Sequence, residues 1–344
     1  MEYKVIDGKG IIPDGAKEIV ESAFEGCAYL QSIVIPDSVT EIGSCAFSGC
    51  TSLKSVEIPD SITVIAFKTF EGCTSLQSIV IPDSVTEIGS CAFSGCTSLQ
   101  SVEIPDSITV IAFKTFEDCT SLQSIVIPNS VTEIGESAFY NCTNLIIFDG
   151  VVPIGYRAFQ CCTSLQSIEI PDGVTEIGEL AFQGCTNLHS IIIPEGVRMI
   201  GKDAFSCCTS LQSIVIPDSV SEIGWGAFER CTSLKSIVIP NSVTEINSQT
   251  FEDCSGLQSI VIPDSVTRIG GLAFNRCISL QSIEITTQEK DPGLSRGRIE
   301  YLLRALSEYS KEFSLRVPIG CDDAYRHYPA FEGKFQKIIA DIDA

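Results

Sequence analysis

Short apolar segments alternate with polar turns along most of the chain. In residues 76–81, LQSIVI, the first, fourth and sixth positions are apolar, and the last two of these have the two-residue period of a β-strand. Pro82 ends this strand, because proline donates no hydrogen bond to a β-ladder. A second extended segment, residues 85–88, follows before Gly89 turns the chain toward Phe93. The pattern therefore predicts a coil with two short strands and an apolar interior.

This coil repeats at a fixed interval. A phenylalanine recurs every 23 residues, apart from one interval of 20, and a cysteine follows each phenylalanine by three residues. The phenylalanines are Phe24, Phe47, Phe70, Phe93, Phe116, Phe139, Phe159, Phe182, Phe205, Phe228, Phe251 and Phe274. One coil cannot bury its own apolar side chains, so neighbouring coils have to stack. A period of roughly 20–29 residues with this pattern of Leu and Ile is typical of leucine-rich repeats.

The pattern L-x-x-I-x-I-P-x-x-V-x-x-I-G-x-x-A-F-x-x-C resembles the repeat of the BspA-like leucine-rich repeat proteins over about residues 10–285. The resemblance implies a repeat solenoid, a right-handed coil of about twelve repeats built mainly from short parallel β-strands. It also implies an adhesion or host-protein-binding module. Within the array, residues 37–82 and 83–128 are nearly identical, which indicates a recent duplication of two repeats.

Both ends depart from the repeat, and this predicts three segments. Residues 1–22 form an N-terminal cap, residues 23–285 form the leucine-rich repeat solenoid, and residues 286–344 form a C-terminal helical insert and capping segment. The cap at the N-terminus has the pattern of an incomplete first coil. Covers of this kind are needed because stacked coils leave an open strand edge at each end.

The C-terminal segment predicts a helix. Residues 291–293 have the composition of a turn, and Ser295 is a candidate N-cap for a helix over residues 296–313. The apolar residues of this helix share one face, which predicts docking against the last coil. Residues 314–318 then resume the strand pattern. Whether the helix is only a cap or also a partner-binding element stays open.

One repeat, around residues 144–150, is three residues shorter than the others. We expect a local kink or a trimmed second strand there. A notch that binds a ligand is the alternative interpretation.

The chain has 17 cysteines, most of them in the repeat. In a stack of identical coils their side chains run parallel, which favours a ladder of buried thiols. Of the additional cysteines, Cys45 and Cys91 lie two coils apart, as do Cys161 and Cys207, and that distance of about 10 Å is too long for a disulfide. The paired Cys-x-x-Cys spacing of a structural zinc site is absent. We expect neither disulfides nor a metal centre.

The net negative charge of the chain disfavours anionic partners. The net charge is −22, and an acidic chain repels nucleic-acid phosphates and anionic membranes, so we expect no nucleic-acid binding and no membrane insertion. The N-terminus lacks the basic and apolar pattern of a signal peptide. Many unpaired thiols, and a start without that pattern if taken at face value, favour the cytoplasm, whereas the family resemblance implies the cell surface or secretion. Localisation therefore stays open.

The residue pattern does not favour catalysis. The only histidines are His189 and His327, and neither has a nucleophile and an orienting acid at matching repeat positions. Asp recurs after the proline that ends the first strand, a pattern typical of solvated turns; calcium binding by rows of carboxylates is the alternative. We expect no enzyme activity and no catalytic, cofactor-binding or metal-binding residues.

The outward face of the first strand is the candidate site. Its outward position lies between two core isoleucines, and no Glu interrupts it from residue 192 to residue 261. The candidate protein-binding residues are Ile192, Val215, Val238, Val261, Glu169 and Glu284. Valine suits a β-strand without any partner, but contiguous exposed apolar surface is typical of contact sites. We expect a monomeric, non-enzymatic solenoid that binds a protein of unknown identity; the alternative is a structural or self-associating scaffold.

Overall fold

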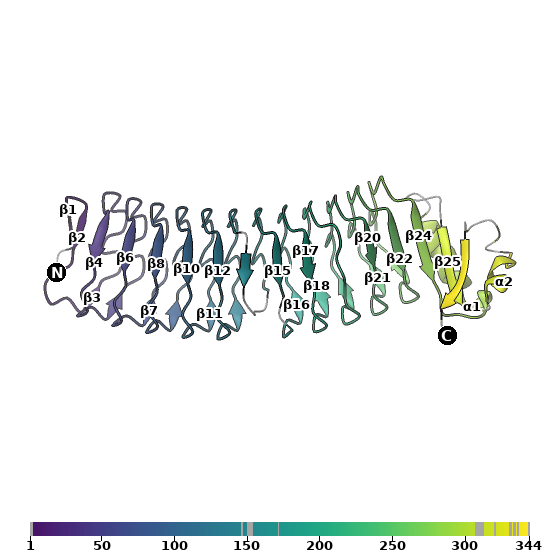
Figure 1. Ribbon diagram of the computed structural model, residues 1–344, viewed down its shortest axis with the longest axis horizontal. Helices are drawn as coiled ribbons and strands as arrows, with labels where there is room; N and C mark the ends of the chain where they lie inside the picture. The colour runs from purple at the N-terminus through teal and green to yellow at the C-terminus, as the bar shows by residue number, and fades with distance from the viewer. Residues whose placement is uncertain are drawn as a thin grey trace. The chain divides into compact units, whose positions relative to one another are not determined.

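The structure is a computed structural model that describes residues 3–145, 147–149, 154–170, 172–306, 313–319, 321–329, 332, 335 and 337–342. The chain packs as two compact units, Met1–Ile191 and Ile192–Ala344, which we call unit 1 and unit 2. Both units are stacks of coils, and most coils contribute a first strand to a long sheet and a second strand to one of several short parallel ladders (Figure 1). The predicted fold class, a repeat solenoid of short parallel strands with a C-terminal helical part, is confirmed.

In unit 1 the first strands of successive coils lie side by side. They are β2 (Lys9–Ile11), β4 (Ser32–Val34), β6 (Ser55–Glu57), β8 (Ser78–Val80), β10 (Ser101–Glu103), β12 (Ser124–Val126), β14 (Ile147–Asp149) and β15 (Ser167–Glu169). Ser55 pairs with Ser78, one repeat later, and across the short repeat Ile147 pairs with Ser167. The second strands pair two by two: β3 (Glu18–Ile19) with β5 (Glu41–Ile42), β7 (Val64–Ile65) with β9 (Glu87–Ile88), and β11 (Val110–Ile111) with β13 (Glu133–Ile134). Strand β16 (Glu176–Ile177) forms a parallel bridge with Ile154.

Unit 2 has the same kind of coil. It begins with Ile192, the last residue of β17 (Ser190–Ile192), which forms a parallel bridge with Val215. Its later first strands are β20 (Ser236–Val238), β22 (Ser259–Ile262) and β24 (Ser282–Thr286). Its second strands are β18 (Met199–Ile200), β19 (Glu222–Ile223), β21 (Glu245–Ile246) and β23 (Arg268–Ile269).

The repeated phenylalanines form the centre of each unit, and all of them are buried. Phe47 and Phe70 in unit 1 have ring centroids 5.4 Å apart and planes 3° apart, and Phe205 and Phe228 in unit 2 are 5.5 Å and 5° apart. Parallel rings at this separation are offset, an arrangement that stabilises beyond the burial of area. The short repeat keeps the stack, because Phe139 and Phe159 lie 5.4 Å apart.

The repeat cysteines from Cys50 onward are buried beside this stack. Most of their thiols donate a hydrogen bond to the backbone carbonyl oxygen of the phenylalanine in the preceding coil. The thiol of Cys119 lies 3.2 Å from the carbonyl oxygen of Phe93, and the thiol of Cys254 lies 3.0 Å from that of Phe228. Cysteine is small and apolar enough for a stacked interior and still supplies a weak donor. All 17 cysteines are in the thiol form, and the predicted ladder of parallel thiols is observed.

A turn before each core phenylalanine ties consecutive coils together. The residue two positions before the phenylalanine has a left-handed φ, such as 56° at Cys45 and 57° at Lys68. Its N–H donates to the carbonyl group three positions before the next phenylalanine: Cys45 N lies 2.9 Å from Phe67 O, and Lys68 N lies 3.1 Å from Ser90 O. We call this series of bonds the edge ladder. Gly89 comes directly before Ser90, a residue of this ladder. Glycine is needed at this position because a Cβ atom there would lie 2.7 Å from the backbone nitrogen of Phe67.

The second strand of the short repeat is trimmed, as predicted. It is reduced to Ile154, which forms single parallel bridges with Ile134 and Ile177. The first strand β14 is kept and pairs with both neighbouring strands. Residues 146 and 150 of the predicted kink lie outside the described residues.

The N-terminal end is covered by a hairpin. Strand β1 (Lys4–Ile6) pairs antiparallel with β2, and β2 already pairs with β4 in the register of the repeat. Tyr3 packs edge-on against Phe24, with centroids 5.5 Å apart and planes at 70°, and its hydroxyl donates to Glu18 O at 2.7 Å. Tyr3 therefore closes the phenylalanine stack of unit 1.

Helix α1 (Pro292–Leu306) begins before the predicted position. The N–H of Gly293 donates to Asp291 Oδ1 at 2.8 Å, and proline suits the first position of a helix. The N-cap is therefore Asp291, and the predictions of a turn over residues 291–293 and of Ser295 as N-cap are wrong. The predicted end at Phe313 is also wrong, because Phe313 is the first residue of β25 (Phe313–Pro318).

The helix docks on the last coil, as predicted. Ile299 and Leu302 are fully buried. The guanidinium of Arg298 donates to Val266 O at 2.8 Å and forms an ion pair with Asp264 at 3.2 Å. These contacts favour the role of a cap.

Strand β25 resumes the coil pattern predicted for residues 314–318. It pairs parallel with β24 and with β26 (Lys337–Ile342), and Leu315 pairs with Ile338 at the repeat spacing. The short helix α2 (Asp322–Arg326) lies between these strands in the chain, and its Tyr325 is fully buried.

Replacement of a stacked phenylalanine should destabilise unit 2. Phe205→Ala removes a fully buried ring that lies 5.5 Å from Phe228, so the free energy of unfolding should fall by about 3–5 kcal/mol. Denaturant unfolding measures this, with the exposed Val215→Ala as control. A loss below about 1 kcal/mol would mean that the ring is not part of a packed core.

The thiol ladder predicts a sharp contrast between native and denatured protein. After denaturation without any reductant, a thiol reagent should titrate close to 17 groups per chain, because parallel side chains stack without pairing. The native protein should react at far fewer sites, since most of these thiols are buried. A denatured count near one would show that the cysteines are bridged.

Burial of the thiols should also make the fold sensitive to alkali. Burial raises the pKa of Cys50, helped by the neighbouring Cys27, and that of Cys277, each to about 12, whereas an exposed thiol has a pKa of about 8.5. The unfolded chain therefore loses these protons first, and stability falls as the pH rises between about 8.5 and 12, by up to about 1.4 kcal/mol per pH unit for each thiol. Urea midpoints from pH 7 to 10.5 measure this, and Cys119→Ala should reduce the slope. A midpoint that does not change with pH would contradict it.

Candidate functional site

The outward position of the first strand is strongly exposed in unit 2. In each coil the residue lies between two buried isoleucines, so it points away from the core. Exposed fractions are 72% for Ile192, 78% for Val215 and 63% for Val238, and Val261 is half-exposed. We call these four residues the apolar row.

The members of the apolar row lie on consecutive coils. Ile192 forms a bridge with Val215, and Val238 pairs with Val261 in the β20–β22 ladder. The N–H of Lys235 donates to Gln212 O at 3.2 Å, which joins the coils of Val215 and Val238. The structure therefore brings together the four apolar residues that the sequence singled out.

The two predicted glutamates have different surroundings. Glu284 pairs with Val261 along the sheet, and its carboxylate accepts two bonds from Arg316, at 2.7 Å from Nε and 3.2 Å from Nη2. This bidentate ion pair bounds the apolar row at β24. Glu169 belongs to β15 in unit 1, and its side chain lies outside the described residues.

In unit 1 the same position alternates between Val and Glu. Val34, Val80 and Val126 are 82%, 74% and 62% exposed, and Glu57 and Glu103 lie on the strands between them. A carboxylate therefore interrupts every apolar contact on this face. The longest uninterrupted set of apolar residues on the first-strand face is the apolar row of unit 2.

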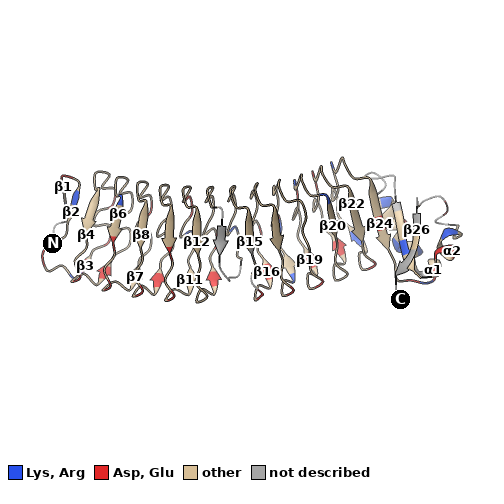
Figure 2. Ribbon diagram, viewed as in Figure 1, with Lys and Arg blue, Asp and Glu red and all other residues tan. Residues whose placement is uncertain are grey.

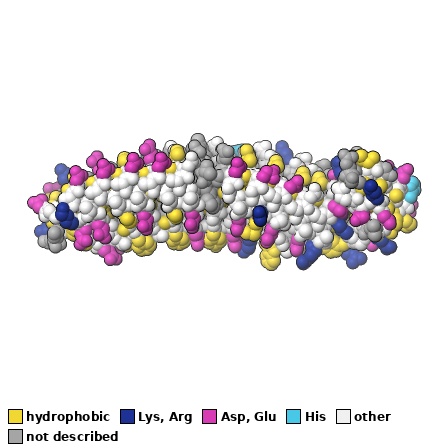
Figure 3. Space-filling model, turned by 90° about the horizontal axis from the view of Figure 1, so that it is seen from below, with side chains coloured by type: hydrophobic (Ala, Val, Ile, Leu, Met, Phe, Trp, Pro, Cys, Tyr) yellow, Lys and Arg dark blue, Asp and Glu magenta, His cyan; other side chains and the backbone are white. Residues whose placement is uncertain are grey.

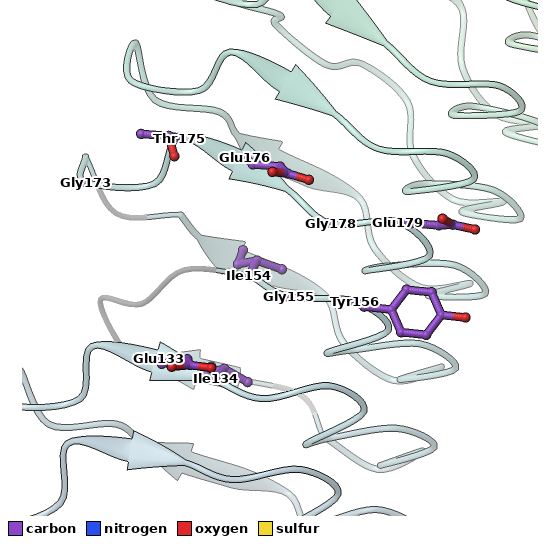
Figure 4. Close-up of a pocket in the computed structure, with 10 residues that line it drawn as sticks. All are labelled: Glu133, Ile134, Ile154, Gly155, Tyr156, Gly173, Thr175, Glu176, Gly178 and Glu179. Atoms are coloured by element: carbon purple, nitrogen blue, oxygen red, sulfur yellow. The ribbon is translucent and has the colours of Figure 1, made fainter.

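A groove lies on the second-strand side of unit 1, at the trimmed coil. Its volume is about 490 Å³, and Glu133, Ile154, Tyr156, Glu176 and Glu179 contribute to its lining. Figure 4 shows these residues on three successive coils, with Tyr156 and Glu179 projecting outward. The groove is at the place where the sequence suggested a notch; that it binds a ligand stays a prediction.

Carboxylates on the turn side of unit 2 have polar partners within the protein. Asn275 and Gln249 donate to Glu252 at 2.7 Å and 2.6 Å, and these bonds lower the pKa of its carboxyl group. Burial raises the pKa of Glu229, against the effect of the neighbouring Arg230. This arrangement is typical of a surface held together by its own side chains.

The two histidines and the possible metal ligands of the described residues do not come together in one site. His189 is exposed, and His327 Nδ1 lies 2.9 Å from the backbone oxygen of Asp323. Within the described ranges, no group of three His, Cys, Asp or Glu side chains could hold a metal ion. No helix in the same residues is long and apolar enough to span a membrane.

The repeat geometry agrees with the comparison to known families. The family described as "BspA type Leucine rich repeat region (6 copies)" matches residues 17–146 and 152–281. The chain belongs to this BspA-type leucine-rich repeat family. No curated protein matches the chain.

Several solved structures are similar to this BspA-type protein, and two of them illustrate the match. A leucine-rich repeat protein from Bacteroides ovatus is 29% identical, with a TM-score of 0.62, and the match covers 91% of this chain and 97% of that one. A leucine rich cell surface protein from Faecalibacterium prausnitzii is 34% identical, with a TM-score of 0.52, and the match covers 78% of this chain and 83% of that one.

Proposed function

We propose that this BspA-type chain is a non-enzymatic module that binds a protein partner through the apolar row of unit 2, in the manner of an adhesion protein. The observation that carries the proposal is the exposure of Ile192, Val215 and Val238, which are 63–78% exposed on consecutive coils. Contiguous apolar side chains on a soluble protein lose contact with water when a partner covers them, which favours association.

The ion pair at one end of the apolar row supports the same role. Polar groups at the rim of an interface fix the position of a partner, while the apolar centre contributes most of the affinity. Glu284 pairs with Val261, and its ion pair with Arg316 is suited to this rim. The similarity to a cell surface protein of Faecalibacterium prausnitzii favours a partner met outside the cell.

The partner can be captured from the apolar row itself. A photo-crosslinking residue in place of Val215 should attach to the bound protein, and the same residue in place of Val80 in unit 1 serves as the matched control. Both valines are similarly exposed, at 78% and 74%. A crosslink to a second copy of the chain would support the self-associating scaffold in place of the proposed function.

Val215→Glu together with Val238→Glu should weaken binding of the captured protein by at least about tenfold, because a carboxylate pressed into an apolar interface loses its water. The melting temperature should stay nearly unchanged, since exposed substitutions change stability by about 0.5 kcal/mol or less. Val80→Glu with Val126→Glu is the control in unit 1. Unchanged affinity in the unit 2 variant, with an intact fold, would remove the apolar row as the site.

A further inference from the structure

The turn edge of unit 1 carries a second ordered surface. The residues three positions before successive core phenylalanines form the edge row, and the edge ladder joins them coil by coil. The members of the edge row are Phe67, Ser90, Phe113, Glu136, Tyr156 and Glu179. Cys91 N lies 2.9 Å from Phe113 O, and Ser137 N lies 3.1 Å from Tyr156 O. An aromatic ring therefore occupies every second coil.

These three rings are at least partly exposed, and a neighbouring cation contacts each of them. Phe67 is 46% exposed and Phe113 is 41% exposed, and Tyr156 is partly buried and less exposed than either. A cation from the next residue lies near each ring: Lys68 Nζ is 5.4 Å from the Phe67 centroid, and Arg157 Cζ is 4.9 Å from the Tyr156 centroid. Such cation–π contacts hold a ring in place.

The lysines beside Phe67 and Phe113 are paired with carboxylates. Lys68 forms an ion pair with Glu71 at 2.9 Å, and Lys114, which lies over Phe113, forms one with Glu117 at 2.8 Å. The chain as a whole carries a net charge of −22, which repels anionic polymers such as nucleic acids. The charge pattern thus suits a neutral ligand.

Alternating side chains extend to the second strands of the same coils. Val64 and Val110 are 38% and 40% exposed on β7 and β11, in the coils of Phe67 and Phe113. The intervening strands β5, β9 and β13 begin with Glu, and Figure 2 shows acidic residues on alternate second strands of unit 1. Figure 3 shows apolar and acidic side chains interspersed along this side of the coils.

Duplication alone does not explain the aromatic pattern. Phe67 and Phe113 lie at equivalent positions of the duplicated segments 37–82 and 83–128, so their likeness follows from that event. Tyr156 lies outside both segments, in the short repeat, and continues the row at the same interval of two coils. It also lines the groove of about 490 Å³ together with Glu179.

The interval of two coils selects a ligand geometry. Strands of successive coils lie about 4.8 Å apart, so rings on alternate coils recur at about 10 Å. An extended β-1,4-linked glycan advances by about one coil spacing per sugar, so two sugars span two coils, and it turns each sugar over relative to the last. It therefore presents the same apolar ring face at every second sugar. Ser90, Glu136 and Glu179, on the coils between and beyond the rings, carry hydroxyl and carboxylate groups that can bond sugar hydroxyls.

We propose that the edge row of unit 1 binds a neutral β-1,4-linked glycan, with Phe67, Phe113 and Tyr156 each stacking on an alternate sugar. This site is separate from the apolar row, so it does not rest on the proposed protein partner.

Calorimetric titration of the full chain with cellohexaose and with chitohexaose tests the proposal and distinguishes the two sources of such a glycan. Binding to at least one of them, without comparable binding to α-linked maltohexaose, is expected. Phe67→Ala with Phe113→Ala should weaken it by about tenfold or more, and Tyr156→Ala should also weaken it, because each removes a stacking ring. Phe113→Tyr should keep binding close to that of the wild type.

Tyr29→Ala is the matched control, because Tyr29 is an aromatic residue of unit 1 that is 85% exposed and lies outside the edge row; it should leave binding unchanged. Each variant is compared below its own melting temperature, because the edge-row rings are partly buried and their loss can lower stability. The proposal is overturned by failure of both β-linked hexasaccharides to bind, by equal binding of maltohexaose, or by folded edge-row variants that bind as the wild type does.

Discussion

Each coil of this protein can bury its phenylalanine only against the phenylalanine of a neighbouring coil. Rings such as Phe93 and Phe116 stack 5.5 Å apart and within 4° of parallel. That contact requires the same residue at the same place in successive coils, and it therefore imposes the repeat. The cysteine thiol that bonds the phenylalanine carbonyl of the coil before, and the edge ladder that joins the turns, both depend on this register.

A repeated interior places the outward side chains in rows as well. The core restricts what may vary inside, but it leaves the residue between two buried isoleucines and the residue at the turn free to differ between coils. Unit 2 uses the first of these positions for the apolar row, and unit 1 uses the second for alternating aromatic and polar side chains. Both proposed sites are therefore consequences of register rather than of a pocket built for one ligand.

Repetition also explains what could be predicted. The repeat pattern predicts a core position for Phe205 and Cys208, because equivalent residues recur in many coils and all of them need the same surroundings; both residues are buried. The outward position of Val215 follows from the same argument. The family and the stacked fold were within reach of the sequence for this reason.

Features that occur once were predicted poorly. Ser295 and Asp291 both have the chemistry of an N-cap, and only the bond from Gly293 to Asp291 decides between them. Tyr3 closes the phenylalanine stack of unit 1, and the hairpin that positions it does not follow the repeat pattern of the sequence. The aromatic residues of the edge row were visible as Phe67, Phe113 and Tyr156 at one repeat position, but their exposure and bracing by cations depend on the turn geometry.

The central claim is that register between neighbouring coils holds the protein together, and removal of coils tests it most directly. Deletion of residues 83–128 removes one copy of the duplication and keeps the register, whereas deletion of residues 83–116 shifts it. Urea unfolding followed by far-ultraviolet circular dichroism should show a cooperative transition and native signal per residue for the first deletion, and loss of both for the second. Equal behaviour of the two deletions, whether both fold or both fail, would contradict the account.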